Sequence, residues 1–117
     1  MNIQTGKIGE KHAKLYLLNK NLKFIASNFY SKFGEVDLIF LDNQELVFVE
    51  VKTRKSDWFG TGIEALTIKK RNKIVKTLFY FLNYASKKHF RSWRIDLISV
   101  KLNHKNKVIR IEHLINI

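Results

Sequence analysis

The sequence contains no cysteine, no proline, five glycines, and only ten acidic residues against twenty-two basic ones. The absence of cysteine excludes disulfide bonds and thiolate sites, whether catalytic or metal-binding. No apolar run reaches the roughly 20 residues that cross a membrane, and the N-terminal MNIQTGKIGEKHAK has no apolar signal core. We therefore expect a cytoplasmic protein without a membrane partner.

The shortage of acidic residues leaves a formal net charge of +12 on a chain of 117 residues. Phosphate contacts dominate the binding of nucleic acids, so this charge on a small protein indicates a nucleic-acid partner. A basic surface that serves solubility, or a ribosome-associated protein, is the alternative that composition leaves open. The chain has no repeat, low-complexity tract or linker-like segment, which predicts one domain over residues 1–117.

Hydrophobic periodicity predicts two helices, over about residues 6–20 and 68–87. Thr67 is positioned to cap the second helix. The residues expected on the apolar face of the first helix are Ile8, Leu15 and Leu18; those expected on the second are Ile68, Val75, Leu78 and Leu82.

Five strands are predicted from runs rich in branched and aromatic residues, at 22–31, 35–41, 45–53, 92–100 and 107–115. The order helix, three strands, helix, two strands predicts an α/β layered domain with a central mixed sheet and helices against its faces. In the loop over residues 55–62 we expect Trp58 and Phe59 to pack on the core rather than to stack on a base.

Two carboxylates interrupt the most hydrophobic of these strands: Asp37 in GEVDLIFL and Glu50 in ELVFVEVKT. A carboxylate in an apolar strand is unfavourable unless a partner compensates it. A symmetric turn centred on residues 43–44 predicts that Asp37 lies directly opposite Glu50, and Glu35 opposite Lys52. One end of this hairpin would then gather three carboxylates and one ammonium.

The period-2 alternation of a strand places Phe48, Glu50 and Lys52 on one face. Two adjacent carboxylates repel each other unless a cation lies between them, and the oxygen ligands of Asp37 and Glu50 suit Mg²⁺ or Mn²⁺. The ammonium of Lys52 could orient or deprotonate a water, or neutralise charge that develops on phosphorus. This pattern predicts metal-assisted phosphodiester hydrolysis. The alternative is a surface hairpin with solvated ion pairs such as Glu35–Lys52.

The segment GEVD, followed after twelve residues by EVK, resembles the D-x(n)-E-x-K core of the PD-(D/E)xK nuclease superfamily, with Val36 in place of the usual proline. Together with GEKHAKLYL, NFYSKFGEVDLI, VFVEVKTR and RIDLISV, it makes residues 9–100 resemble the YraN-type family of bacterial proteins, which is similar in fold to Holliday-junction resolvases. The resemblance implies a restriction-endonuclease-like fold, a Mg²⁺ or Mn²⁺ cofactor, and an endonuclease that cuts DNA rather than RNA. Branched or structured DNA is the implied substrate, and a homodimer is expected by analogy. A non-catalytic nucleic-acid-binding module with the same fold is the alternative.

Carried over residue by residue, the resemblance implies that Asp37 and Glu50 bind the metal and that Lys52 is catalytic. It also implies an acidic helper, Glu10, on the first helix, and a metal ligand in the backbone carbonyl of Val51.

Several basic residues are candidates for contacts with a phosphate backbone. Lys70 matches the family's lysine at the start of the second long helix, where it would approach a phosphate. Lys69, Lys73 and Lys76 lie at i, i+4 and i+7 of the same helix, which is equally typical of a solvated face and of a phosphate-binding stripe. Arg54, at the end of VFVEVKTR, is the fifth candidate.

Three further residues are expected to support the site. Gly34 suits a turn, a bulge or a close approach of the backbone. Glu35 is expected to form an ion pair with Lys52 or Arg54 rather than to bind metal. Asp96 is expected to pair with Arg94 on the same strand face and to stabilise the structure.

Overall fold

A mixed five-stranded sheet with two helices forms the protein, whose computed structural model describes residues 3–55, 66–84 and 90–117. The elements within these residues are α1 (Ile3–Asn19), β1 (Lys23–Ser31), β2 (Gly34–Asp42), β3 (Glu45–Lys55), α2 (Ile68–Tyr84), β4 (Ser92–Leu102) and β5 (Val108–Leu114). Their order is the predicted one. Trp58, Phe59 and the predicted helical residues 85–87 lie outside the described residues. Neither described helix is long and apolar enough to cross a membrane.

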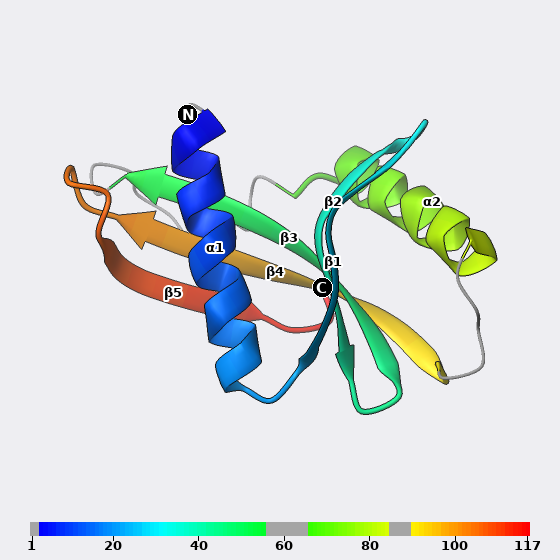
Figure 1. The fold of residues 1–117 in the computed structure, drawn as a ribbon. Helices are drawn as coiled ribbons and strands as arrows, with labels where there is room; N and C mark the ends of the chain where they lie inside the picture. Colours follow the sequence, from blue (N-terminus) through cyan, green and yellow to red (C-terminus); the bar gives the residue numbers. More distant parts are fainter. Residues whose placement is uncertain (1–2, 56–65, 85–89) are drawn as a thin grey trace.

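The strands lie in the order β1-β2-β3-β4-β5, so that each pairs with its neighbour in sequence. The β3–β4 pair is parallel and the other three pairs are antiparallel, which confirms the predicted mixed sheet. Parallel neighbours require a crossover connection, and the segment that connects β3 to β4 contains α2 (Figure 1).

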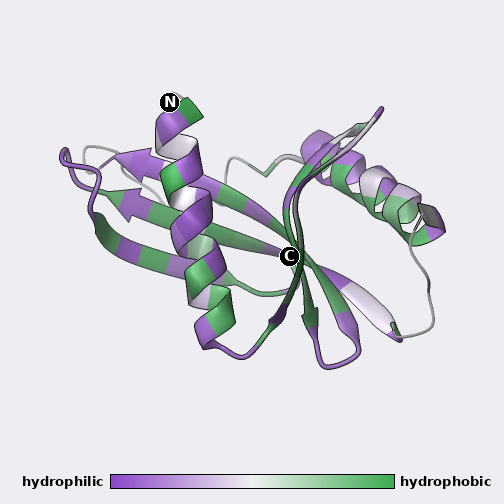
Figure 2. Ribbon diagram, in the orientation of Figure 1, coloured by the Kyte–Doolittle hydropathy of each residue, from purple (hydrophilic) through white to green (hydrophobic). Residues whose placement is uncertain are grey.

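The two faces of the sheet carry separate apolar clusters, one under each helix. Val47, Val49 and Val51 pack in a cluster with Ala13 and Leu17 of α1. The other cluster joins strand and α2 residues, among them Leu46, Phe48, Ile74, Leu78 and Phe81. Figure 2 shows the resulting hydrophobic colouring along the middle of the strands. The predicted placement of Phe48, and by alternation Glu50, on the opposite face from the valines is confirmed.

The predicted apolar face of α1 is wrong. Leu15 and Leu18 are 47% and 40% exposed, and Ile8 is only partly buried. The buried residues of α1 are Thr5, Gly9, Ala13 and Leu17. Three of these four are small, and the close approach of α1 to β3 at Gly9 leaves no room there for a larger side chain.

Gly9 marks the closest approach of α1 to the sheet. A β-carbon at this position would lie 1.8 Å from Oγ1 of Thr53, a buried and β-branched side chain with little freedom to move. We expect Gly9→Ala to destabilise the protein by about 1–3 kcal/mol, the usual effect of overpacking. Denaturant unfolding of the two proteins measures this difference.

Gly6→Ala is the matched control, since Gly6 is in the same helix but lines a cavity. It should be neutral or stabilising, because alanine favours helix more than glycine does. Adding Thr53→Ala to Gly9→Ala should recover part of the lost stability by removing Oγ1 and Cγ2. Equal stability of Gly9→Ala and the wild type would contradict the close approach.

Candidate active site

The β2–β3 hairpin has the predicted register near its turn and departs from it at Asp37. Pairs run from Asp42 with Glu45 to Leu38 with Val49. Beyond Leu38, β2 diverges from β3 and continues with β1 toward α2 (Figure 1). The carboxylate of Asp37 accepts a 2.8 Å hydrogen bond from the amide of Val51. This bond to the Asp37 side chain therefore takes the place of the next backbone hydrogen bond between β2 and β3.

The predicted opposition of Glu35 and Lys52 is wrong, because the two strands have separated before they reach this pair. Glu35 is paired with Tyr30 on β1, and its carboxylate accepts a 2.7 Å hydrogen bond from Asn28. Gly34 begins β2 with a φ of 148°, a backbone conformation that favours glycine, directly after the β1–β2 turn.

Asp37 and Glu50 nevertheless form a carboxylate pair where the strands separate. Glu50 is 7% exposed, and Asp37 is half-buried. Burial, followed by the contact with the Glu50 carboxylate, raises the pKa of Asp37 to about 9, although the Val51 amide opposes the shift. The pair therefore holds a proton at neutral pH unless a cation compensates its charge.

Two lysines from different elements adjoin this pair. Nζ of Lys70 lies 3.3 Å from Oε2 of Glu50. The backbone amide of Lys70 donates a 3.1 Å hydrogen bond to Thr67 Oγ1, which caps the start of α2. Burial and the neighbouring Lys70 lower the pKa of the half-buried Lys52 ammonium. The pKa of Lys70 is raised, because its contacts with Lys52 and Glu50 outweigh its burial. Lys70 thus supplies positive charge to Glu50, and Lys52 is the lysine that loses its proton more easily.

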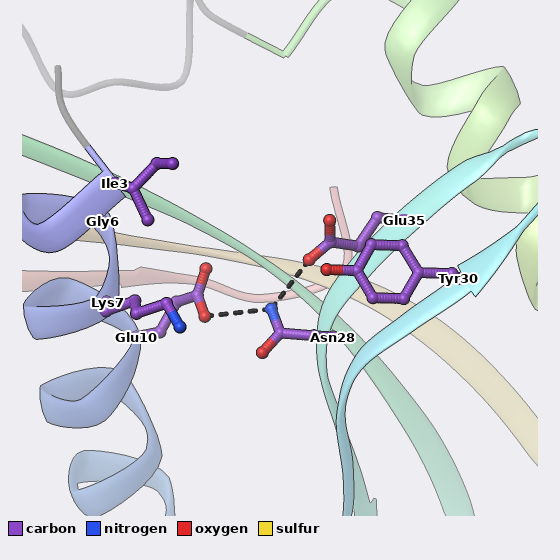
Figure 3. A pocket seen from close by; sticks show the side chains of 7 residues that line it. All are labelled: Ile3, Gly6, Lys7, Glu10, Asn28, Tyr30 and Glu35. Carbon is purple, nitrogen blue, oxygen red and sulfur yellow. Dashed lines mark hydrogen bonds between the residues drawn. The ribbon is translucent and has the colours of Figure 1, made fainter.

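Glu10 approaches the same site from α1. The amide of Asn28 donates to Glu10 at 3.1 Å and to Glu35 at 2.7 Å, linking α1 to β2 (Figure 3). Burial is the main cause of the raised pKa of Glu10, and the charges of Glu35 and Glu50 raise it further. Asn28 was not predicted as a site residue, because its only signal in the sequence is a polar residue within an aromatic strand. Its φ of 50° is left-handed.

A groove lies between α1 and the β1–β2 pair. It consists of two adjoining cavities of about 430 Å³ and 290 Å³, both lined by Lys7, Glu10 and Asn28. Tyr30 and Glu35 line the larger one (Figure 3). Glu10 is therefore reachable from solvent on the α1 side of the site.

The donor set fits a sparsely ligated hard cation. Among residues 3–55, 66–84 and 90–117, no group of three or more histidine, aspartate or glutamate side chains is arranged to hold a metal ion. Structural zinc requires four protein ligands, whereas Mg²⁺ is usually held by one or two carboxylates and completes its shell with water and substrate phosphates. The adjacent carboxylates of Asp37 and Glu50 meet this requirement of Mg²⁺ for one or two carboxylate ligands.

The other candidate basic residues lie along α2 and near the end of β3. Lys69, Lys73 and Lys76 lie exposed along α2. Arg54 is half-buried, donates a 3.1 Å hydrogen bond to the carbonyl of Thr53 and contributes to the lowered pKa of Lys52. Of the α2 lysines, it is Lys70 that reaches the site.

Asp96 lies on the other face of the sheet from Glu50. It pairs with Val49 in the parallel ladder and is fully buried. Its carboxylate accepts hydrogen bonds from Arg94 Nε at 3.0 Å and the Asn116 amide at 2.9 Å, and it bonds His113 Nε2 at 2.7 Å. These bonds lower its pKa against the opposing effect of burial. The predicted Arg94–Asp96 pair is present, and it stabilises the structure on the face of the sheet opposite Glu50.

Comparison with known proteins assigns the chain to a family. The family model described as "Uncharacterised protein family UPF0102" matches residues 9–100. A UPF0102 protein of Caldanaerobacter subterraneus subsp. tengcongensis is 40% identical over 112 residues, covering 95% of this chain and 91% of that protein. One of Vibrio parahaemolyticus is 40% identical over 97 residues (83% and 80% covered), and one of Clostridium acetobutylicum is 38% identical over 106 residues (91% and 86% covered).

The matched residues 9–100 contain the whole of the site described above, from Glu10 on α1 through the Asp37–Glu50 pair to Lys52 and Lys70. In agreement with the YraN-type resemblance of its sequence, the chain belongs to the UPF0102 family.

Proposed function

We propose that this protein is a metal-dependent nuclease that hydrolyses phosphodiester bonds in DNA. The observation that carries the proposal is the Asp37–Glu50 carboxylate pair, in which Glu50 is buried and Asp37 half-buried, with Lys52, whose pKa is lowered by burial, beside it. Burying two adjacent carboxylates is unfavourable for folding, and such arrangements concentrate at functional sites. The mixed sheet with a helix on each face is consistent with the restriction-endonuclease-like fold that forms part of the proposal.

Each residue of the site has a proposed role. A Mg²⁺ or Mn²⁺ ion held by Asp37 and Glu50 would polarise the phosphoryl group and lower the pKa of a bound water. Lys52 takes the proton of the attacking water or stabilises the charge that develops on phosphorus. The amide of Val51 orients the Asp37 carboxylate.

The flanking residues act on the same reaction from two sides. Lys70 neutralises Glu50 in the free protein and turns toward a phosphoryl oxygen when substrate is present. Glu10, oriented by Asn28, accepts a hydrogen bond from water on the α1 side. The choice of DNA over RNA, and of branched or structured DNA, is based on the resemblance to Holliday-junction resolvases.

A non-catalytic nucleic-acid-binding module is the second candidate. The 3.3 Å ion pair between Lys70 and Glu50 favours it, because this lysine already supplies a cation to the carboxylates without a metal. In that case the site would hold α2 against β3, and the basic residues would bind phosphates without cleavage.

Cleavage and metal binding together test the proposal. We expect cleavage of at least one substrate in a panel of linear, branched and single-stranded DNA with Mg²⁺ or Mn²⁺, and none with chelator. Glu50→Gln should weaken Mn²⁺ binding, measured by calorimetry, by at least about tenfold, since disturbing outer-shell partners alone has effects of that size. Glu112→Gln, which removes a carboxylate on β5 that pairs with Arg110, is the control.

Equal Mn²⁺ affinity of Glu50→Gln and the wild type would contradict the metal site. A wild-type protein that binds nucleic acids of the panel but cleaves none of them, with either metal, would identify the binding module instead.

A further inference from the structure

A row of basic residues crosses the sheet beyond the proposed site. Arg54 on β3 is paired with Lys101 on β4, and Lys101 is paired with Arg110 on β5. Directly paired residues project their side chains from the same face of a sheet. Three cations therefore stand side by side on three neighbouring strands, and we call Arg54, Lys101 and Arg110 the cationic row.

This arrangement is unfavourable for folding. Neighbouring strands are about 4.8 Å apart, well within the roughly 8 Å screening length of physiological salt, and like charges directly opposite each other destabilise a sheet. Arg110 has one counter-charge, Glu112, at 3.5 Å, and its side chain remains 67% exposed. Lys101 forms no ion pair with any residue that the structure describes. A polyanion bound on this face would compensate the repulsion.

The cationic row continues the face that carries the site. Strand alternation places Arg54 on the same side as Glu50 and Lys52, while Thr53 points to α1, where it meets Gly9. On this face α2 packs over β1 and β2, through contacts that include Val36 and Ile39.

Basic residues therefore flank the carboxylate pair on two sides. Lys70 approaches Glu50 from α2. The cationic row lies at the end of the sheet where β3 and β4 terminate and β5 begins (Figure 1).

We propose that the cationic row binds the phosphate backbone of a nucleic-acid strand that extends from the Asp37–Glu50 pair across β3, β4 and β5. That the strand reaches the Asp37–Glu50 pair, where its scissile phosphate would lie, rests on the proposed nuclease function. Binding to the cationic row requires no cleavage. Cations at the regular intervals of neighbouring strands suit a polyanion with a repeating charge, and contacts of this kind carry no base specificity.

The test compares two double variants that remove the same charge. Lys101→Gln/Arg110→Gln removes two members of the row, and Lys20→Gln/Lys23→Gln removes two exposed lysines where α1 passes into β1. Fluorescence anisotropy in chelator measures binding to single-stranded DNA, duplex DNA and RNA of equal length over a range of salt concentrations. Thermal unfolding of the same proteins reports stability.

The row variant, Lys101→Gln/Arg110→Gln, should bind on the order of tenfold more weakly near 0.1 M salt. The slope of the logarithm of its binding constant against the logarithm of the salt concentration should be shallower by about 2, since each phosphate contact contributes roughly 0.9. Its unfolding midpoint should not fall, and should rise if repulsion within the row dominates. Lys101→Arg, which keeps the charge, should bind as the wild type does. The control variant should lose far less affinity.

Three results would overturn the proposal. Equal binding by the row variant and the control variant would remove the row from the interface. A lower unfolding midpoint with unchanged binding would make the row structural. In either case cleavage by the wild type would leave the nuclease proposal standing. A wild-type protein that binds none of the three nucleic acids would overturn both.

Discussion

Replacing Lys52 with methionine is expected to lower the single-turnover rate of metal-dependent cleavage by on the order of 10²–10³, the usual effect of losing one group that stabilises transition-state charge. Methionine keeps much of the stem volume and removes the ammonium. Because burial and Lys70 lower the pKa of Lys52, its side chain gives up a proton more easily than an exposed lysine does, and the resulting amine can accept the proton of the attacking water. The contact is made in the transition state, so the loss should appear in the rate and not in substrate affinity.

Lys105→Met is the matched control, because Lys105 is exposed in the turn between β4 and β5. Both variants should bind the same oligonucleotide alike and unfold near the wild-type temperature. Lys52→Arg should not restore the rate, because a guanidinium cannot take a proton from water. A folded Lys52→Met protein that cleaves at the wild-type rate would exclude a catalytic role for Lys52.

Replacing Asp37 with asparagine is expected to stabilise the metal-free protein at neutral and alkaline pH. The pKa of Asp37 rises from 3.8 to about 9 in the folded protein, through burial and then through Glu50. Below about pH 4 this carboxyl is protonated in both the folded and the unfolded state. Between about pH 4 and 9 the unfolded state loses the proton first, so the wild type loses stability as the pH rises through this window.

The effect of Asp37→Asn should be large, because a full proton of difference corresponds to about 1.4 kcal/mol per pH unit. An amide also fits the site: its oxygen can accept the hydrogen bond from Val51, and its nitrogen can donate to Glu50. Denaturant unfolding in chelator at about pH 5, 7 and 9 should show a pH dependence in the wild type that is flattened in the variant.

Asp42→Asn serves as the comparison, since Asp42 accepts a 3.0 Å ion-paired hydrogen bond from Arg94 and its removal should reduce stability. Mn²⁺ should stabilise wild-type protein at high pH and Asp37→Asn much less, because ligand binding to the folded state stabilises it. Parallel pH profiles of the wild type and Asp37→Asn would contradict the carboxylate pair.

Local patterns in the sequence were enough to place the strands and part of their pairing. Alternation identified the valines of β3 as one face and Phe48 as the other, because side chains of a strand alternate with a period of two. The register from Leu38–Val49 to Asp42–Glu45 followed from a short turn alone, since a hairpin turn determines the pairs next to it. The identity and spacing of Asp37, Glu50 and Lys52 led to the prediction of metal-assisted phosphodiester hydrolysis, and the family followed from the resemblance of the longer motifs around them.

The sequence could not show where neighbouring elements separate or how closely they approach. The helical pattern of α1 pointed to Leu15 and Leu18, whereas the tight contact of Gly9 with Thr53 decided which face is buried. The divergence of β2 from β3 moved Glu35 away from Lys52 and toward Asn28. Both outcomes depend on packing between elements, which hydrophobic periodicity does not encode.

Length, charge and strand alternation are properties of the chain itself, and they determined the class of fold and the candidate carboxylates, while the resemblance of its motifs pointed to the family. Only the tertiary structure brought Lys70 to Glu50, Asn28 between Glu10 and Glu35, and Lys101 between Arg54 and Arg110. Glu50 and Lys70, Glu10 and Asn28, and Arg54 and Lys101 are far apart in sequence and meet through helix packing or the parallel β3–β4 pairing, whereas the antiparallel β1–β2 and β4–β5 pairs add Glu35 and Arg110. Their proximity follows from burying apolar surface on both faces of one sheet, which no local pattern specifies.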